Sequence, residues 1–138
     1  MRTLEESFVP CDEAIALHEL GINKVQVSCS AAYILRKFSL GFFHSSHCAE
    51  DLVLAPTYAQ ALDFLRNHFR IEGWVQPYLS PEPRRNEAKF WYGGRTSNEG
   101  DSIGIYDTHL EAELECLKHL IKFIKEHDEF NMYKLWIN

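Results

Sequence analysis

No stretch of this sequence approaches the roughly 18 consecutive apolar residues that a membrane-spanning helix requires. Residues 1–7 carry more acidic than basic side chains and lack the apolar run of a secretory signal peptide. These two absences predict a cytoplasmic protein that has no membrane partner.

Paired cysteines are missing as well. The four cysteines lie far apart, without a Cys-x-x-Cys motif, at positions 11, 29, 48 and 116. This spacing indicates reduced thiols that behave as small apolar side chains, and it does not favour a disulfide framework. Because Cys116 lies within an amphipathic stretch, we expect it in the core.

The sequence also lacks a surplus of positive charge. Lys and Arg total 14 against 20 Asp and Glu, which gives a formal net charge of -6. Such a charge disfavours non-specific attraction to phosphate backbones and to anionic membranes. Protein surfaces or small molecules are therefore the expected partners.

Catalytic signatures are absent too. The sequence contains no Gly-x-Ser-x-Gly, His-Glu-x-x-His or cysteine-protease motif, and its 7 histidines have no diagnostic spacing. We assign no catalytic residue and no cofactor, and a small enzyme of unidentified class is only the second alternative function.

His44, His47 and Cys48 form a cluster that resembles a metal site. A structural zinc site needs four ligands, and this loop offers only three, crowded closely together. We therefore expect a solvated loop and no bound metal. The glycine-rich stretch 93–100 lacks the lysine of a P-loop and leads into a strand, so it is expected to connect strands.

The sequence does contain two strongly patterned helices. In the first, Ala55–His68, Thr57 and Gln60 match the capping box that opens a helix. The second runs from Thr108 to about Glu126 and opens with the same kind of box. Its apolar stripe, which we expect to lie in the core, comprises Leu110, Leu114, Leu117, Ile121 and Ile124.

Three aromatic-rich strands are predicted between these helices, at Gly73–Leu79, Lys89–Tyr92 and Ser102–Tyr106. Pro77 lacks the N–H that a sheet ladder needs, so the first strand is expected at an edge. The resulting α-β-β-β-α order predicts an α+β fold, in which an antiparallel sheet carries the two main helices on one face.

Before this core, Pro10 opens a short helix that Gly21 ends. Residues 24–29 alternate as a half-buried strand does, and 44–51 are polar enough for a loop. Residues 33–43 fit a strand-turn-strand about as well as a helix, and their aromatic content favours the strands.

The whole chain, 1–138, is interpreted as a single α+β domain. Residues 1–54 supply the N-terminal helix and hairpin, and 55–129 supply the α-β-β-β-α core. The C-terminal tail, 130–138, is too apolar to remain in solvent, so we expect it to pack on the domain or against a second copy.

The candidate partner surface combines aromatic and basic residues from the first two core strands and their turn: Trp74, Tyr78, Trp91, Tyr92, Arg84 and Arg85. These aromatics are either core residues or, when exposed, a patch for a partner. A flat apolar patch favours a protein partner. Aromatics interleaved with the two arginines, Lys89 and Arg95 favour nucleic acid.

The α-β-β-β-α order also resembles that of double-stranded RNA-binding domains, which reach a minor groove with the turn that here holds Arg84 and Arg85. Those domains place a phosphate-contacting lysine cluster at the start of their second helix. Here that place holds Glu111 and Glu113, which repel RNA. A nucleic-acid-contacting domain is therefore the first alternative function.

Three segments together, 8–21, 54–62 and 106–118, resemble a group of small uncharacterised proteins of Bacteroidetes and their phages and mobile elements. The region 29–48 departs from that group. The resemblance implies an accessory protein to which no activity and no site residue is attached. The function that we expect is a non-enzymatic protein-interaction module, with an unknown protein partner or self-association.

Overall fold

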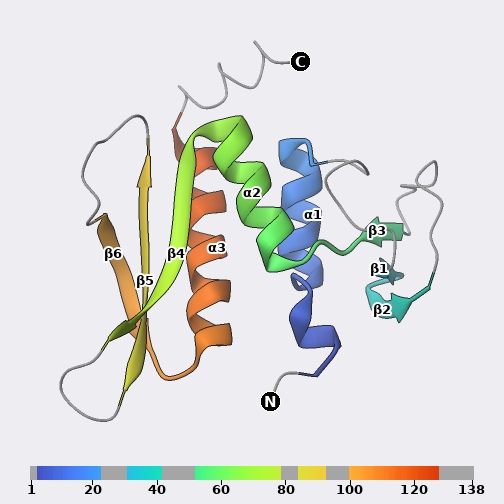
Figure 1. Cartoon of the computed structure of the whole chain (residues 1–138). Helices are drawn as coiled ribbons and strands as arrows, with labels where there is room; N and C mark the ends of the chain where they lie inside the picture. Colours follow the sequence, from blue (N-terminus) through green and yellow to red (C-terminus); the bar gives the residue numbers. More distant parts are fainter. Residues whose placement is uncertain (1–2, 23–30, 42–51, 79–83, 93–99, 128–138) are drawn as a thin grey trace. The chain divides into compact units, whose positions relative to one another are not determined.

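The computed structural model describes residues 3–22, 31–41, 52–78, 84–92 and 100–127. Within these ranges the chain forms three α-helices and two antiparallel three-stranded sheets, which confirms the α+β class (Figure 1). The chain divides into two compact units, Met1–Phe64 and Leu65–Asn138. The single-domain organisation stays a prediction.

The first unit begins with a 3-10 turn, Glu5–Ser7, and helix α1, Cys11–Leu20. Pro10 is the N-cap of α1, as the sequence predicted. The helix ends at Gly21, whose φ of 108° is easily reached only by glycine and lets its N–H donate to the last turn. The predicted start and end of α1 are therefore confirmed.

A small sheet follows α1 in the first unit. Its strands are β1, Ala31–Ile34, β2, Lys37–Leu40, and β3, Leu52–Leu54, in the order β2-β1-β3. The predicted strand-turn-strand is confirmed as the β1–β2 hairpin, whereas β3 was not predicted. The strand expected at 24–29 and the loop expected at 44–51 lie entirely outside the described residues.

Aromatic rings tie this sheet to the residues that precede α1. The Tyr33 hydroxyl donates to the carbonyl of Val9 at 2.7 Å. The Phe38 ring lies 5.5 Å from Phe8 and 5.7 Å from Tyr33, measured between ring centroids. Tyr33 therefore links β1 to Val9 through its hydroxyl and to Phe38 of β2 through its ring.

Helix α2, Tyr58–Phe69, contains the division between the two units. Its capping box is present: the Gln60 N–H donates to Thr57 Oγ1 at 3.2 Å, and the Thr57 N–H donates to Gln60 Oε1 at 2.9 Å. The predicted start at Ala55 was too early, because Thr57 is the cap and the residues before it are not helical.

The second unit contains β4, Ile71–Tyr78, β5, Arg85–Tyr92, β6, Asp101–Tyr106, and helix α3, His109–Glu126. The strands pair in the order β4-β5-β6, so β4 lies at an edge, as Pro77 predicted. The α-β-β-β-α order of α2 to α3 is confirmed. The strands are longer than predicted, because hydrogen-bonded pairing extends β5 back to Arg85.

Helix α3 packs along one face of this sheet (Figure 1). Thr108 is its N-cap and accepts from the Glu111 N–H at 3.1 Å. Gly73 permits a close approach, since a Cβ there would lie 2.5 Å from the Cys116 sulfur and 2.7 Å from Leu120. The ring of Phe90 meets this same helix.

The buried face of α3 differs from the predicted stripe. Leu110 and Leu114 are only half-buried. The residues that are buried are Ala112, Cys116, Leu117, Leu120, Ile121 and Ile124. The prediction that Cys116 lies in the core is confirmed. No helix within the described ranges is long and apolar enough to span a membrane.

Candidate functional site

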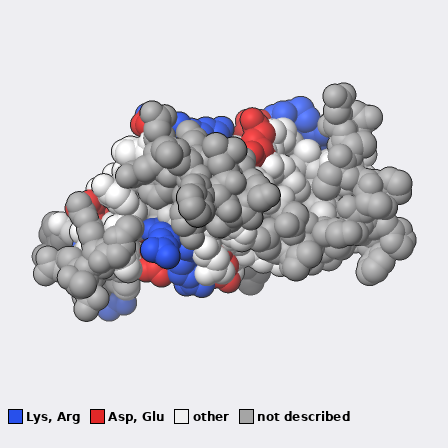
Figure 2. All heavy atoms as spheres, turned by 90° about the horizontal axis from the view of Figure 1, so that it is seen from above, with Lys and Arg blue, Asp and Glu red and all other residues white. Residues whose placement is uncertain are grey.

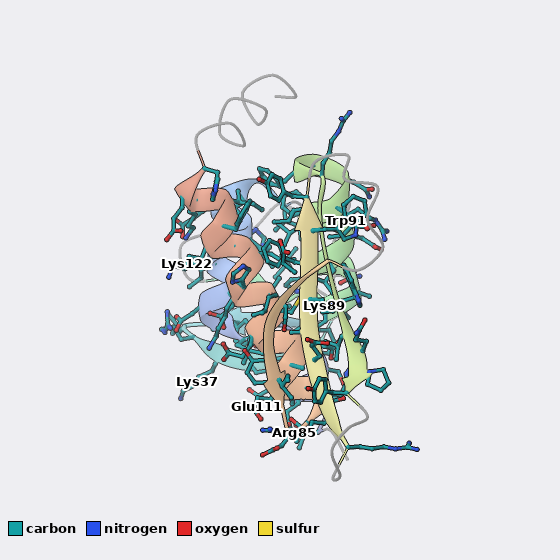
Figure 3. All side chains as sticks on the ribbon, turned by 90° about the vertical axis from the view of Figure 1, so that its left-hand side faces the viewer. Lys37, Arg85, Lys89, Trp91, Glu111 and Lys122 are labelled. Carbon is teal, nitrogen blue, oxygen red and sulfur yellow. The ribbon has the colours of Figure 1, made fainter. Side chains whose placement is uncertain are left out.

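One face of the β4-β5-β6 sheet is turned away from α3. Strand pairing places Trp74 opposite Lys89 and Tyr78 opposite Arg85, so these four side chains share a face. Gly73 and Phe90, which contact α3, belong to the other face. Figure 3 shows Lys89 and Trp91 on the side of β5 away from α3.

We name this surface the outer face. The alternation of side chains and the register of the three strands assign ten residues to it: Glu72, Trp74, Gln76, Tyr78, Arg85, Glu87, Lys89, Trp91, Ser102 and Ile105.

Trp74 is held in place across the outer face. Its indole N–H donates to Gln76 Oε1 at 3.1 Å, and Gln76 Nε2 donates to Glu87 Oε1 at 3.3 Å. The far edge of the ring reaches Gly100, where a Cβ would lie 2.5 Å from the ring. Because Gly100 immediately precedes β6, the ring of Trp74 crosses the middle strand.

Trp91, Tyr78 and Lys89 are among the partly exposed residues of the outer face. Within the described residues, the Trp91 indole N–H, the Tyr78 hydroxyl and the Lys89 ammonium have no hydrogen-bond partner. Tryptophan and tyrosine combine an apolar ring with a polar tip, which suits them to contact surfaces.

The charges of the outer face balance. Glu72 and Glu87 supply two negative charges, and Arg85 and Lys89 supply two positive ones. Arg85 Nε also lies 3.1 Å from Asp107 Oδ1. Because these charges balance, the outer face lacks the positive field that attracts phosphates. Figure 2 views the chain from above and not onto this face, and there acidic and basic side chains of the described residues are interspersed.

The structure brings together four of the six predicted surface residues: Trp74, Tyr78, Arg85 and Trp91 lie on the outer face. Tyr92 lies on the opposite face, where its ring centroid is 4.8 Å from Phe123 of α3. Grouping Tyr92 with Trp91 is therefore corrected, because adjacent residues of a strand point to opposite faces. Arg84 is exposed just before β5.

Gln76 and Glu87 are outer-face residues that the sequence analysis missed. They hold Trp74 through the two hydrogen bonds described above. The signal that could have found Gln76 is its position midway between Trp74 and Tyr78 in an alternating strand. Arg95, expected beside this surface, lies outside the described residues.

His119 lies on the α3 side of the sheet. Its ring centroid is 4.5 Å from that of Phe90. Among the described residues, its Nε2 is the buried side-chain nitrogen that has no hydrogen-bond partner. Burial lowers the pKa of His119, and the nearby Lys122 lowers it further. His119 is therefore a neutral packing residue at neutral pH.

The described part of the chain offers neither a metal cluster nor an activated thiol. No group of three or more His, Cys, Asp or Glu residues lies together in it. His44, His47 and Cys48 lie outside it, so the absence of zinc there stays a prediction. Cys116 is a free thiol, and burial raises its pKa to about 12, which keeps it protonated and unreactive.

In comparisons with known proteins, the chain matched no protein-family model, no curated protein and no solved structure.

Proposed function

We propose that the chain is a non-enzymatic protein-interaction module that binds a protein partner through the outer face. The observation that carries the proposal is the combination of Trp74, Tyr78 and Trp91 on a sheet face with no net charge. Aromatic residues are enriched where protein surfaces meet.

The fixed position of Trp74 supports this role. Its hydrogen bond to Gln76 and its contact with Gly100 hold the ring before any partner arrives. Binding therefore does not lose rotamer freedom at this residue, and such preorganisation strengthens association. Trp91 then supplies a second ring of the type that dominates binding energy in protein interfaces.

Nucleic acid is the second candidate partner, since Lys89 lies opposite Trp74 and bases stack on aromatic rings. Two observations weigh against it. The outer face has no surplus of positive charge, and the start of α3 presents Glu111 and Glu113. Phosphate contacts supply most of the non-specific affinity for nucleic acid, so a face without net charge is expected to bind it weakly.

The setting that we propose is the cytoplasm, where Cys11 and Cys116 would stay the free thiols that they are here. From the resemblance of 8–21, 54–62 and 106–118, we further propose an accessory role in a phage or mobile element. The partner would then be a protein of the host or of that element.

Affinity capture with matched variants tests the proposed function. The tagged full chain is compared with Trp91→Ala and with Lys122→Ala, a change at an exposed position of α3. Circular dichroism first establishes that all three are folded. We expect a protein that the parent chain and Lys122→Ala recover and Trp91→Ala loses, with binding reproduced by the two purified proteins.

Two results would contradict the proposal. The first is recovery of nucleic acid, and not of protein, in a way that requires Trp91. The second is a set of bound proteins that Trp91→Ala leaves unchanged, since the outer face would then not be the binding surface.

A further inference from the structure

The charges of the outer face alternate along β5, the middle strand of the sheet. Arg85, Glu87 and Lys89 follow one another on this face at every second residue, and Trp91 ends the row. Reversing the direction of the row places Lys89 on Glu87 and Trp91 on Arg85. The row is therefore complementary to a reversed copy of itself.

Strand β4 has the same property. Glu72 is its first outer-face residue and Tyr78 its last, with Trp74 and Gln76 between them. Because β4 and β5 pair without a register shift, the reversal that matches β5 to its copy also places Glu72 on Tyr78. A tyrosine hydroxyl can donate to a carboxylate, so the complementarity extends over both strands.

Glu87 and Lys89 lie on either side of the centre of the face, and both are partly exposed. Among the described residues, no ion pair joins these two side chains and none engages the Lys89 ammonium. Glu87 Oε1 accepts from Gln76, and its Oε2 has no hydrogen-bond partner in the same part of the chain. Both central charges can therefore pair with groups of another molecule.

The charges at the two ends of the face already have partners. Arg85 Nε lies 3.1 Å from Asp107 Oδ1, and Glu72 Oε1 lies 3.8 Å from Arg66 Nη1. An ion pair at the edge of a guanidinium still allows an aromatic ring to stack on its planar face. The central charges are therefore the ones that select how a second face is oriented.

Two copies can stack their outer faces about a two-fold axis that lies between the sheets, in either of two directions. An axis along the strands places Lys89 on Lys89 of the second copy and Glu87 on Glu87, so like charges meet. An axis across the strands reverses their direction and forms two Lys89–Glu87 pairs. Like charges in contact cost several kcal/mol, so the second arrangement is strongly favoured.

We infer that the outer face binds the outer face of a second copy of this chain, with the strands of the two copies antiparallel and Lys89 of each copy paired with Glu87 of the other. Trp91 of each copy then stacks on the Arg85 guanidinium of the other, a favourable cation–π contact. This inference rests on the proposed function, for which it names the partner.

The size of the face sets the strength of this dimer. At about 3.4 Å per residue, the row from Arg85 to Trp91 is roughly 20 Å long. A face of this length on three strands lies at the small end of specific protein interfaces, so we expect the dimer to form reversibly.

Sedimentation velocity of the purified full chain, over a range of concentrations, tests the inference. The parent is compared with Glu87→Lys, with Lys89→Glu and with the exchange variant that carries both changes. Lys122→Glu, at an exposed position of α3, is the control because it alters the net charge as Lys89→Glu does. Circular dichroism first establishes that every variant is folded.

We expect a dimer whose fraction rises with concentration in the parent and in Lys122→Glu. Each single reversal on the outer face should weaken association by about tenfold or more, because it brings like charges together at both central pairs. Glu87→Lys should do so although it makes each copy less negative than the formal net charge of -6.

Restoring the opposite charges should restore the dimer. In an equimolar mixture of Glu87→Lys and Lys89→Glu, each central contact joins a lysine to a glutamate, so the two variants should form a heterodimer. The exchange variant has the same complementarity within one chain and should regain the affinity of the parent.

Failure of the inference can be separated from failure of the proposed function. If the parent is monomeric at every concentration while Trp91-dependent capture recovers a different protein, the second copy is the wrong partner and the interaction module stands. If the chain dimerises equally well after either single reversal, the dimer uses another surface and the inference is overturned. If the chain is monomeric and capture does not depend on Trp91, both proposals are overturned.

Discussion

Leu35 and Arg36 form the two-residue turn between β1 and β2 with φ angles of 50° and 67°. Both central residues of a type I′ turn need a positive φ, for which Asn-Gly is the favoured pair. Leucine in this region is strained, and Leu35 is 69% exposed, so packing does not compensate.

The double variant Leu35→Asn, Arg36→Gly is therefore expected to stabilise the fold by about 1 kcal/mol. The ion pair of Arg36 with Asp12 is lost, but both side chains are more than 60% exposed, and such pairs contribute little. Urea denaturation measures the change. A loss of stability would show that Leu35 or the ion pair contributes more than its exposure indicates.

Gly100 is the second residue whose conformation matters, because its φ is 62° and the Trp74 ring lies against it. Gly100→Ala should destabilise the chain by roughly 1–2 kcal/mol, since the new Cβ is strained and displaces the ring. Denaturant unfolding followed by tryptophan fluorescence measures this. Ser102→Ala, at an exposed position of β6, should change stability by less than about 0.5 kcal/mol.

At the scale of the element, α3 is the main support of the β4-β5-β6 sheet. Leu117 is fully buried in it, whereas Leu114 is only half-buried. Leu117→Ala should lower the free energy of unfolding by about 2–5 kcal/mol, because it removes buried methyl groups and leaves a cavity.

Leu114→Ala is the matched control for Leu117→Ala, and its loss should be distinctly smaller. Equal losses for the two variants, measured by denaturant titration, would mean that α3 buries a different face from the one observed.

The elements show which structural features can be predicted from sequence. The capping residues Thr57 and Thr108 were found because their side-chain hydrogen bonds are local. Strand β3 was missed because Leu52–Leu54 is too short to alternate, and its pairing with β1 brings together residues far apart in the chain. The outer face was predicted only in part. Gln76 and Glu87 hold Trp74 through a hydrogen bond between two strands, and the sequence does not show which residues pair across strands.

Acid sensitivity is a property of the molecule as a whole, and His119 contributes to it. Its pKa in the folded chain is below 6.5, while the unfolded chain has the ordinary value near 6.5. The unfolded state therefore binds a proton first as the pH falls. The contribution of His119 to the free energy of unfolding is fully present above pH of about 6.5. It is lost as the pH falls from there toward the pKa of the folded chain.

His119→Phe should reduce the loss of stability between pH 7 and pH 5, because phenylalanine keeps the packing on Phe90 and cannot be protonated. Unfolding by urea at both pH values measures the effect. Lys122 opposes protonation of His119, and Glu126 favours it. Lys122→Ala should therefore also reduce the loss of stability between pH 7 and pH 5, but by less than His119→Phe. An unchanged pH dependence in His119→Phe would assign acid sensitivity to other groups.

The division into two units could not be predicted from the sequence. Domain boundaries usually fall in linkers rich in proline, glycine or polar residues. Here the boundary lies between Phe64 and Leu65, two buried residues in the middle of α2, where nothing in the composition changes.

A continuous helix across this boundary also restricts how the chain can be divided. Cutting the chain between Phe64 and Leu65 would interrupt the hydrogen-bond ladder of α2 and leave each half with a fragment too short to be a stable helix. We therefore expect that neither unit, expressed alone, keeps its part of α2 helical.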